Sequence, residues 1–333
     1  MQAFQLLEHH RTNPKLQKVD LATPHIKPHE ILVQVKAAGV NPLDNLIARG
    51  DLKLLTPYKL PLVMGNECAG IVTQVGENVN QFHVGDRVFA RLPIDQIGAF
   101  AHYVAIPATA AAPMPNGLSF VEAAGIPLAA LTAFQALELM QVQEGQSIFI
   151  SGGSGGLGSM AIPLAKARGL TVYTNGNKQS RDRVLALGAD RYLDYRTEDY
   201  LSTLPKVNHV LDSLGGNELY RQMKLLQEGG HLVSLRGLPN GRFAQRFGLP
   251  LWKQWLLALA GLQTDAKARA QKATYDFLFV ESNGAQLIQV AQWIETQRIR
   301  PSIDHVFPFE KTIEALNKVA QGGSAGKVVV ELE

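Results

Sequence analysis

Three glycines after a short apolar segment form the pattern in this sequence that is most informative about chemistry. Gly153, Gly155 and Gly158 have the spacing GxGxxG, and they lie between the apolar letters IFIS and the amphipathic letters SMAIPLAKARG. Glycines at this spacing allow a tight turn, let backbone N–H groups approach a pyrophosphate, and open a helix whose N-terminus favours an anion. Because strand, loop and helix signals follow one another in this order, the sequence predicts a dinucleotide-binding site.

The same letters also spell GxSxG around Ser154, which is the pattern of the nucleophile elbow of a serine hydrolase. Such an enzyme needs an acid and then a histidine later in the chain, and Asp212 and His305 stand in that order. Gly158 has no role in an elbow, and a long β-rich segment before the loop is not part of that fold. The hydrolase is therefore the weaker alternative.

The residues that follow the next apolar segment, 171–174, decide which dinucleotide fits. An NAD site carries an acid about 20 residues past the glycine loop, where it binds the ribose diol. Here no acid precedes Asp182, whereas Asn175, Lys178 and Arg181 offer donors suited to a 2′-phosphate. The sequence therefore predicts NADPH. The alternative is that Lys178 and Arg181 only begin a solvated helix, where charges are common.

Composition limits the classes of partner. The 333 residues, 46% of them hydrophobic and 18% charged, are typical of a folded globular protein. A net charge of +3 without a long basic run gives no electrostatic case for nucleic acid. The single cysteine, Cys68, excludes internal disulfides and favours a reducing compartment, which we expect to be the cytoplasm. Since no targeting segment or apolar segment of membrane-spanning length is visible, we expect no membrane partner.

Two regions with different sequence patterns predict two domains. Up to about residue 112, short β-rich segments alternate with turn signals. From 148 to 235, apolar strands alternate with amphipathic helices, which implies a doubly wound parallel sheet covered on both faces. The tail alternates again, and we expect it to fold back on the first domain. The expected domains are a β-rich catalytic domain from residues 1–118 with 266–333, and a dinucleotide-binding domain from residues 119–265.

An apolar insertion at residues 251–262 interrupts the alternation of strands and helices. If the segment LWKQWLLALAGL forms a helix, hydrophobic side chains lie around most of its circumference, which is not expected of a helix that faces only water. A substrate-pocket lid, a subunit contact and a membrane-surface helix are the alternatives. The small number of cations makes the membrane surface the weakest of the three, so we expect a lid or a subunit contact.

Motifs spread over nearly the whole chain point to one family. They are AAGVNPLDNLIARG (37–50), LPLVMGNECAGIVTQVG (60–76), VGDRV (84–88), AAGIPLAALTAFQAL (123–137), the glycine loop, LDSLGG (211–216), IRPSIDHVFPFEKTIEAL (299–316) and GKVVV (326–330). Taken in this order, the chain resembles the medium-chain dehydrogenase/reductase superfamily, and within it the zinc-independent quinone oxidoreductases and enone reductases. The resemblance implies an α/β fold with a β-rich, GroES-like catalytic domain and a doubly wound Rossmann domain. It also implies a homodimer.

The zinc alcohol dehydrogenases of this superfamily place a cysteine and a histidine where this chain has Asn41 and Asn66. A catalytic zinc needs three ligands of thiolate, imidazole or carboxylate type, and only Glu67 remains, so we expect no metal. Without a Lewis acid, little stabilises the alkoxide formed from a simple aldehyde, whereas a quinone or an α,β-unsaturated ketone delocalises the charge onto a distant oxygen. The expected activity is NADPH-dependent reduction of a small quinone or enone.

Three residues are candidates for the substrate pocket. The resemblance places Asn41 and Asp44 near the nicotinamide, where Asn41 would hydrogen-bond the acceptor carbonyl and Asp44 would orient the loop. Asp44 as a turn-stabilising residue without a catalytic part is an equal alternative. Tyr58 is a candidate proton donor, although an aromatic residue beside a proline more often serves packing. Leu46 stands where related enone reductases often place a lysine, so no charged oxyanion stabiliser comes from that position.

The motif match also implies a set of cofactor contacts. Together with Asn175, Lys178 and Arg181, they are Thr132, Gly153, Ser154, Gly155, Gly156, Leu157, Gly158, Tyr195 and Lys327. Tyr195 is expected beside the adenosine phosphate, the alternative being a partly exposed tyrosine after a strand. A redox sensor that binds NADPH without turning over any acceptor is the remaining alternative to an enzyme.

Overall fold

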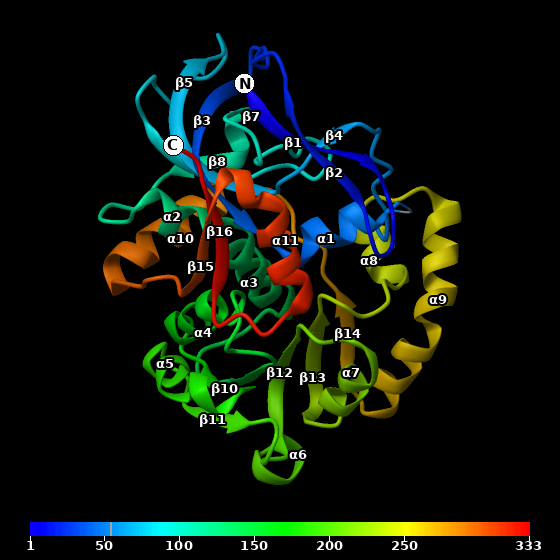
Figure 1. The fold of residues 1–333 in the computed structure, drawn as a ribbon. Helices are drawn as coiled ribbons and strands as arrows, with labels where there is room; N and C mark the ends of the chain where they lie inside the picture. Colours follow the sequence, from blue (N-terminus) through cyan, green and yellow to red (C-terminus); the bar gives the residue numbers. More distant parts are fainter. Residues whose placement is uncertain (54) are drawn as a thin grey trace. The chain divides into compact units, whose positions relative to one another are not determined.

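The computed structural model describes residues 1–53 and 55–333, and they form two compact units. The first contains Met1–Leu131 and Glu281–Glu333, and the second contains Thr132–Val280 (Figure 1). The predicted fold class is confirmed: the first unit is a β-rich domain built from both ends of the chain, and the second is a Rossmann-type domain around a parallel sheet.

The first unit is built on two sheets. A seven-stranded sheet has the order β15-β16-β3-β5-β6-β8, with β7 also paired to β3, and a three-stranded sheet has the order β2-β1-β4. The strands are β1 Gln2–Glu8, β2 Lys15–Asp20, β3 Glu30–Val40, β4 Leu62–Val63, β5 Glu67–Val75, β6 Arg87–Arg91, β7 Tyr103–Pro107, β8 Ala111–Pro113, β15 Ile303–Pro308 and β16 Lys327–Glu331. The last two strands of the chain join the N-terminal sheet, where β16 pairs antiparallel with β3.

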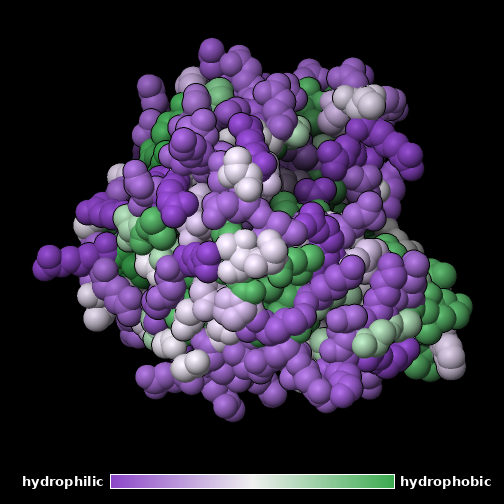
Figure 2. All heavy atoms as spheres, turned by 90° about the horizontal axis from the view of Figure 1, so that it is seen from below, coloured by the Kyte–Doolittle hydropathy of each residue, from purple (hydrophilic) through white to green (hydrophobic). Residues whose placement is uncertain are grey.

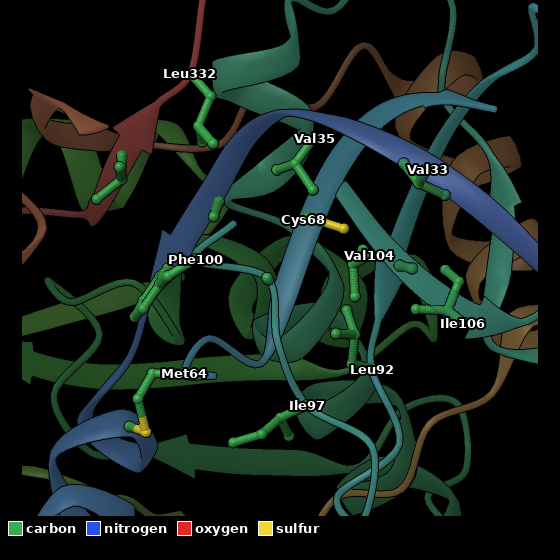
Figure 3. Close-up of a cluster of buried hydrophobic side chains, with 14 of the residues drawn as sticks. Val33, Val35, Met64, Cys68, Leu92, Ile97, Phe100, Val104, Ile106 and Leu332 are labelled. Carbon is green, nitrogen blue, oxygen red and sulfur yellow. The ribbon is translucent and has the colours of Figure 1, made fainter. Parts of the chain in front are cut away.

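Apolar side chains from several strands form the core of this unit (Figure 3). Val33 and Val35 of β3 project into it, and Cys68 of β5 and Phe100 lie in the same cluster with no more than 1% of their surface exposed. The Cys68 thiol is fully buried, and burial raises its pKa to about 12. This thiol is therefore neutral at physiological pH and serves as a small apolar side chain.

Four helices of the first unit follow from local sequence signals. They are α1 Pro42–Arg49, α2 Phe120–Ala124, α10 Gly284–Gln297 and α11 Thr312–Gln321. Asn41 and Asp44 form a capping box at the start of α1, and Ser119 and Glu122 form one at the start of α2, the second as its spacing predicts. Gly50 ends α1 with φ of 79°, a left-handed conformation that glycine adopts at little cost.

The second unit contains a six-stranded sheet whose neighbouring strands are all parallel. Its strands are β9 Ser147–Ile150, β10 Thr171–Gly176, β11 Arg191–Asp194, β12 Val207–Asp212, β13 Leu226–Ser234 and β14 Thr274–Phe277. They are arranged in the order β11-β10-β9-β12-β13-β14, which numbered from the first strand of the unit reads 3-2-1-4-5-6. This order belongs to dinucleotide-binding sheets, in which the ligand binds at the carboxyl ends of the first and fourth strands.

The helices of the second unit connect these strands. They are α3 Pro127–Met140, which begins in the first unit, α4 Gly158–Ala167, α5 Arg181–Ala186, α6 Tyr200–Thr203, α7 Gly216–Met223, α8 Gly241–Arg246 and α9 Leu251–Ala270. Sequence patterning places α7 over residues 217–227, but the helix ends at Met223 and β13 begins at Leu226. This strand begins at the buried Leu226, is exposed over residues 227–229 and is buried again at its end.

The position of β14 differs from the sequence-based expectation. We expected residues 266–333 to join the catalytic domain, yet β14 pairs in parallel with β13 over His231 to Ser234. Tyr275 and Asp276 of β14 are buried, because this strand completes the edge of the parallel sheet. The second compact unit consequently extends to Val280.

The apolar insertion forms the first half of α9, a helix of 20 residues. Leu257 is buried, but most of the insertion's apolar side chains are exposed, with Leu251 at 74%, Trp255 at 73% and Leu259 at 65%. Figure 2 shows hydrophobic atoms gathered at the edge of the molecule where α9 lies. Among the described residues, no helix is both long and apolar enough to cross a membrane.

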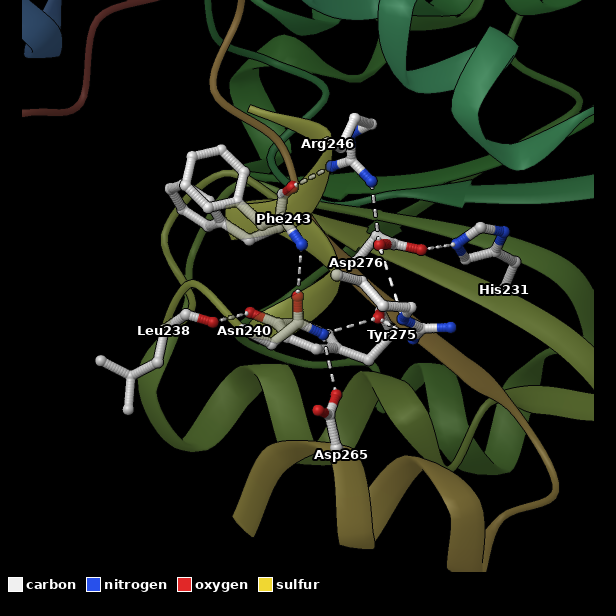
Figure 4. A network of polar contacts seen from close by, with 10 residues as sticks. His231, Leu238, Asn240, Phe243, Arg246, Asp265, Tyr275 and Asp276 are labelled. Atoms are coloured by element: carbon white, nitrogen blue, oxygen red, sulfur yellow. Dashed lines mark hydrogen bonds and ion pairs between the residues drawn. The ribbon is translucent and has the colours of Figure 1, made fainter. Parts of the chain in front are cut away.

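A polar network fastens β14 and α8 to the sheet (Figure 4). The Asp276 carboxylate accepts hydrogen bonds from His231 Nε2 at 2.9 Å and from Arg246 Nη1 at 3.2 Å. Asn240 Nδ2 donates to Asp265 Oδ1 at 2.9 Å, which links the start of α8 to α9. Although burial works in the opposite direction, the hydrogen bond from His231 and the charge of Arg242 lower the pKa of Asp276.

We predict that Asp276→Asn lowers the free energy of unfolding by about 1–3 kcal/mol at neutral pH, because the buried partner of the Arg242 and Arg246 guanidinium groups loses its charge. A carboxyl group whose pKa is lowered by folding contributes stability above the unfolded pKa, about 4, and loses it as pH falls further. The difference from wild type should therefore shrink below about pH 4 in urea unfolding. Glu228→Gln, in the exposed pair with Lys272, is the control and should change little. A difference independent of pH would contradict the assignment.

Candidate functional site

The glycine loop lies between β9 and α4, at the carboxyl edge of the parallel sheet. A Cβ atom on Gly158 would lie 2.2 Å from the carbonyl oxygen of Gly153, and one on Gly153 would lie 2.1 Å from Thr174 Oγ1. Both glycines are therefore required for close packing of the loop against itself and against β10. In the first turn of α4, which begins at Gly158, the N–H groups of Ser159 and Met160 donate to the Gly155 and Leu157 carbonyls at 3.2 and 3.0 Å. The positive end of the helix dipole still points at the glycine loop and favours an anion there.

Two polar side chains from elsewhere in the unit hold this loop in place. The N–H of Gly152 donates to Asn175 Oδ1 at 2.9 Å, and the N–H of Gly153 donates to the Asn175 carbonyl at 3.0 Å. Arg183 Nη2 donates to the Ser154 carbonyl at 2.8 Å. Asn175, predicted as a cofactor contact, is buried and supports the loop. The contribution of Arg183 has no sequence signal, since an arginine in a helix is ordinary.

The residues predicted for the 2′-phosphate follow β10 and β11. Gly176 pairs with Asp194, and the N–H of Tyr195 donates to the Gly176 carbonyl, so Tyr195 and Lys178 leave the sheet at the same edge. Lys178 is exposed, as is Tyr195 at 56%. Arg181 Nη1 instead donates to the Tyr192 carbonyl at 3.3 Å. Thr132 is buried within α3.

Asp212, the acid that a hydrolase would need, has another function. Its carboxylate accepts from Ser234 Oγ at 2.6 Å, from Gln222 Nε2 at 3.0 Å and from the N–H of Gly215 at 3.1 Å. These bonds shape the loop after β12. His305 lies in the first unit beside Asp304, at 3.4 Å. The geometry thus gives no support to a Ser154 hydrolase.

Six buried polar residues gather in the first unit, and we call them the buried polar cluster. They are Asn41, Asp44, Asn66, Glu67, Arg91 and Lys327, each with no more than 4% of its surface exposed. The end of β3, the start of α1, the start of β5, the end of β6 and the start of β16 supply them. Gly39 makes room for the cluster, because a Cβ atom there would lie 2.2 Å from Glu67 Oε1.

The centre of the cluster is a buried ion pair. Lys327 Nζ donates to Glu67 Oε1 at 2.5 Å and to Asn41 Oδ1 at 2.6 Å, and Asn41 Nδ2 donates to the same Glu67 oxygen at 2.7 Å. The second Glu67 oxygen accepts from the N–H of Leu128 at 2.6 Å. Both polar atoms of the Asn41 side chain are consequently engaged within the protein. Lys327, which we expected to contact the cofactor, is the cationic member of this ion pair.

Asp44 caps α1 and is also held by Asn66. Its carboxylate accepts from the N–H of Asn41 at 2.8 Å and from Asn66 Nδ2 at 2.7 Å. Burial, which outweighs these hydrogen bonds, raises its pKa from 3.8 to about 7. The carboxyl group therefore carries a proton in part of the population at neutral pH. The capping geometry agrees with the interpretation of Asp44 as a turn-stabilising residue.

The donor set does not fit a catalytic zinc ion. Asn41 and Asn66 present amides, and the one carboxylate at these positions, Glu67, already binds an ammonium group. In the described part of the chain, no group of three or more His, Cys, Asp or Glu side chains could hold a metal ion. A fixed positive charge, the Lys327 ammonium, lies against the Glu67 carboxylate instead.

Tyr58 lies close to the buried polar cluster and to its member Arg91. The Tyr58 hydroxyl donates to the Ile94 carbonyl at 2.6 Å, and burial raises its pKa well above the usual range, which makes it a poor proton donor. Arg91 is fully buried, and its Nη1 donates to the Leu92 carbonyl. Sequence analysis did not identify Arg91, because an arginine at the end of a strand gives no sign of burial.

Comparison with known proteins adds family information. Residues 27–116 match the family model of the alcohol dehydrogenase GroES-like domain, and residues 187–330 match that of zinc-binding dehydrogenases. The chain is 32% identical over 324 residues to 2-methylene-furan-3-one reductase from Solanum lycopersicum, an alignment that covers 93% of this chain and 74% of the relative. It is 30% identical over 324 residues to the chloroplastic NADPH-dependent alkenal/one oxidoreductase from Arabidopsis thaliana, again covering 93% and 74%.

A solved structure shows the same architecture. The quinone oxidoreductase from Coxiella burnetii superposes with a TM-score of 0.83 at 27% identity, covering 100% of this chain and 99% of that one. The similarity spans both compact units.

We predict that Lys327→Met and Glu67→Gln each lower the free energy of unfolding by about 3–5 kcal/mol, because each leaves a buried charge without its partner. The double variant should lose clearly less than the sum, since neither charge remains. Urea unfolding of the four proteins measures this coupling. The exposed pair Lys166 and Asp190, changed to Met and Asn, is the control and should couple by about 1 kcal/mol or less. Strictly additive losses at Glu67 and Lys327 would contradict the prediction.

Proposed function

Because the chain belongs to the medium-chain dehydrogenase/reductase superfamily, we propose that it is a zinc-independent oxidoreductase that uses NADPH to reduce a quinone or an α,β-unsaturated carbonyl compound. One observation carries the proposal. The residues at the zinc positions form an amide, carboxylate and ammonium cluster, while the second unit keeps a complete dinucleotide-binding sheet and loop. Conjugated acceptors are the class that such a site can reduce, because their developing charge needs only hydrogen-bond donors.

The second unit offers features that fit a dinucleotide. We propose that Gly153 to Gly158 and the first turn of α4 hold the pyrophosphate, and that Lys178 and Tyr195 meet the adenosine 2′-phosphate. We also keep Thr132, Arg181 and Lys327 as proposed contacts, although the last two also have partners in the protein. NADPH supplies a hydride when bound.

In the first unit, the chain's own residues position an acceptor. The ion pair of Glu67 and Lys327 fixes the Asn41 amide, so Asn41 is a positioning residue. Asp44 fixes the first turn of α1 through the Asn41 N–H. The Asn41 amide has no spare donor in this arrangement, and both oxygen atoms of Asp44 accept hydrogen bonds from the protein, so the proton that completes reduction is proposed to come from water.

Assembly and compartment follow from the sequence and the family. We propose a homodimer, and a reducing compartment such as the cytoplasm, supported by a single cysteine that is fully buried. The exposed apolar side of α9 is the proposed lid or subunit contact.

The assay of substrate class measures NADPH oxidation by absorbance in the presence of EDTA. A quinone and an enone should be reduced, whereas a saturated aldehyde should react at least about a hundredfold more slowly, because nothing stabilises its alkoxide. An ester control tests the hydrolase. Reduction of the aldehyde alone would contradict the proposal, and so would tight NADPH binding without turnover of any acceptor, which is the behaviour of a sensor.

Cofactor choice has its own test. We predict that Lys178→Glu lowers kcat/KM for NADPH relative to NADH by about tenfold or more, because a charged donor to the 2′-phosphate becomes a repulsive carboxylate. Lys272→Glu, an exposed lysine after α9 paired with Glu228, is the matched control and should leave the ratio unchanged. An unchanged ratio in Lys178→Glu would show that Lys178 only begins a solvated helix.

A further inference from the structure

We propose that Arg91 binds the carbonyl oxygen of the acceptor and stabilises the negative charge that reduction places on it. The inference rests on the proposed function and names the residue that recognises the substrate. Arg91 ends β6 directly opposite Glu67 of β5 in the antiparallel ladder. Directly opposite residues project from the same face of a sheet, so the guanidinium lies on the face that carries the ion pair of Glu67 and Lys327.

The guanidinium has donors that the protein leaves unused. Arg91 has no exposed surface, and within the described residues its Nε and Nη2 atoms have no hydrogen-bond partner. Only Nη1 is engaged, by the Leu92 carbonyl. Buried donors without partners are rare in native proteins, and leaving a charged donor unpaired is costly. Two neighbouring N–H groups of one arginine match the geometry in which this side chain binds an oxygen acceptor.

The surrounding acids do not take up these donors. Asp44, Glu67 and the exposed Glu281 act on Arg91 through their charge. The carboxylates of Asp44 and Glu67 accept their hydrogen bonds from Asn41, Asn66, Lys327 and Leu128. Tyr58 donates its hydroxyl hydrogen to the Ile94 carbonyl. Burial lowers the pKa of Arg91 to about 10, so the guanidinium remains charged at neutral pH. A charged guanidinium with two nitrogen atoms that lack hydrogen-bond partners within the described residues therefore lies on the same sheet face as the ion pair of Glu67 and Lys327.

The chemistry of an enone matches this cation. A hydride adds to the β-carbon, the electron pair of the C=C bond moves toward the carbonyl, and the carbonyl oxygen becomes an enolate oxygen. A proton from water then bonds to the α-carbon and the C=O bond re-forms, which gives the saturated ketone while the dinucleotide is oxidised. A quinone places the same charge on a phenolate oxygen. Donors fixed in a site that excludes water stabilise such an oxygen strongly.

The first test uses the unmodified protein loaded with NADP⁺. 4-Nitrophenolate imitates the product oxyanion, and 4-nitroanisole is its neutral counterpart of similar shape. Calorimetry should show that the anion binds at least about tenfold more tightly, as expected for a hydrogen bond between charged partners. Equal binding of the two compounds, or binding of neither, would overturn the inference. This readout does not require turnover, so it remains decisive if no acceptor is reduced.

The second test uses Arg91→Gln and Arg91→Lys. Arg91→Gln should lose about tenfold or more in anion binding and in kcat/KM for an enone, while the affinity for NADPH is unchanged. Arg91→Lys should recover part of both losses because it restores a positive charge. Arg87→Gln is the control on the same strand, since Arg87 is exposed and donates to the Leu118 carbonyl.

The possible outcomes distinguish the proposed function from the proposed role of Arg91. If wild type reduces enones and folded Arg91→Gln does so equally well, the proposed function stands and the role of Arg91 is wrong. If wild type reduces no acceptor but binds the anion through Arg91, the proposed reaction is wrong and the oxyanion site stands. Circular dichroism shows whether each variant is folded, and if neither Arg91 variant folds, the comparison of the two nitro compounds decides.

Discussion

The buried ion pair between Glu67 and Lys327 is the interaction on which the first unit depends. It joins β5 to β16 across 260 residues of sequence, and Asn41 ties both partners to the end of β3. Two charges without water are stable only where their remaining atoms have hydrogen-bond partners. Here the Leu128 N–H and the Asn41 amide provide them, and Gly39 provides the space. The C-terminal strand therefore belongs to the site as much as to the sheet.

This arrangement explains how a fold shared with zinc-binding dehydrogenases can work with different chemistry. The amides of Asn41 and Asn66 cannot replace thiolate and imidazole as zinc ligands, but they can bridge carboxylates and cations. The cluster becomes a hydrogen-bond network instead of a coordination sphere, and among its side-chain atoms Asn66 Oδ1 and two nitrogen atoms of Arg91 lack partners within the described residues. Such a network orients neighbouring groups without itself acting as a Lewis acid, and this favours acceptors whose charge is delocalised.

Sequence reasoning predicted the parts of this molecule that depend on local signals. The glycine loop, the capping box at Ser119 and the strand and helix alternation all follow from neighbouring residues, and the structure contains each of them. Residues that meet through register were missed. Arg91 faces the ion pair only because β5 and β6 pair Glu67 with Arg91, and β14 joins the parallel sheet through contacts that no short segment reveals.

The charges in the buried polar cluster connect the protonation of Asp44 to the environment of Arg91. Lys327 and Arg91 are positive, Glu67 is negative, and Glu281 adds a second acid that acts on Arg91. Glu281 is exposed, so among the buried groups an ionised Asp44 balances Arg91 as Glu67 balances Lys327, and a protonated Asp44 leaves one buried positive charge. Burial raises the pKa of Asp44 to about 7, so both states are populated at neutral pH. A substrate oxygen that becomes negative next to Arg91 therefore competes with Asp44 for the same positive charge, and protonation of Asp44 removes that competition.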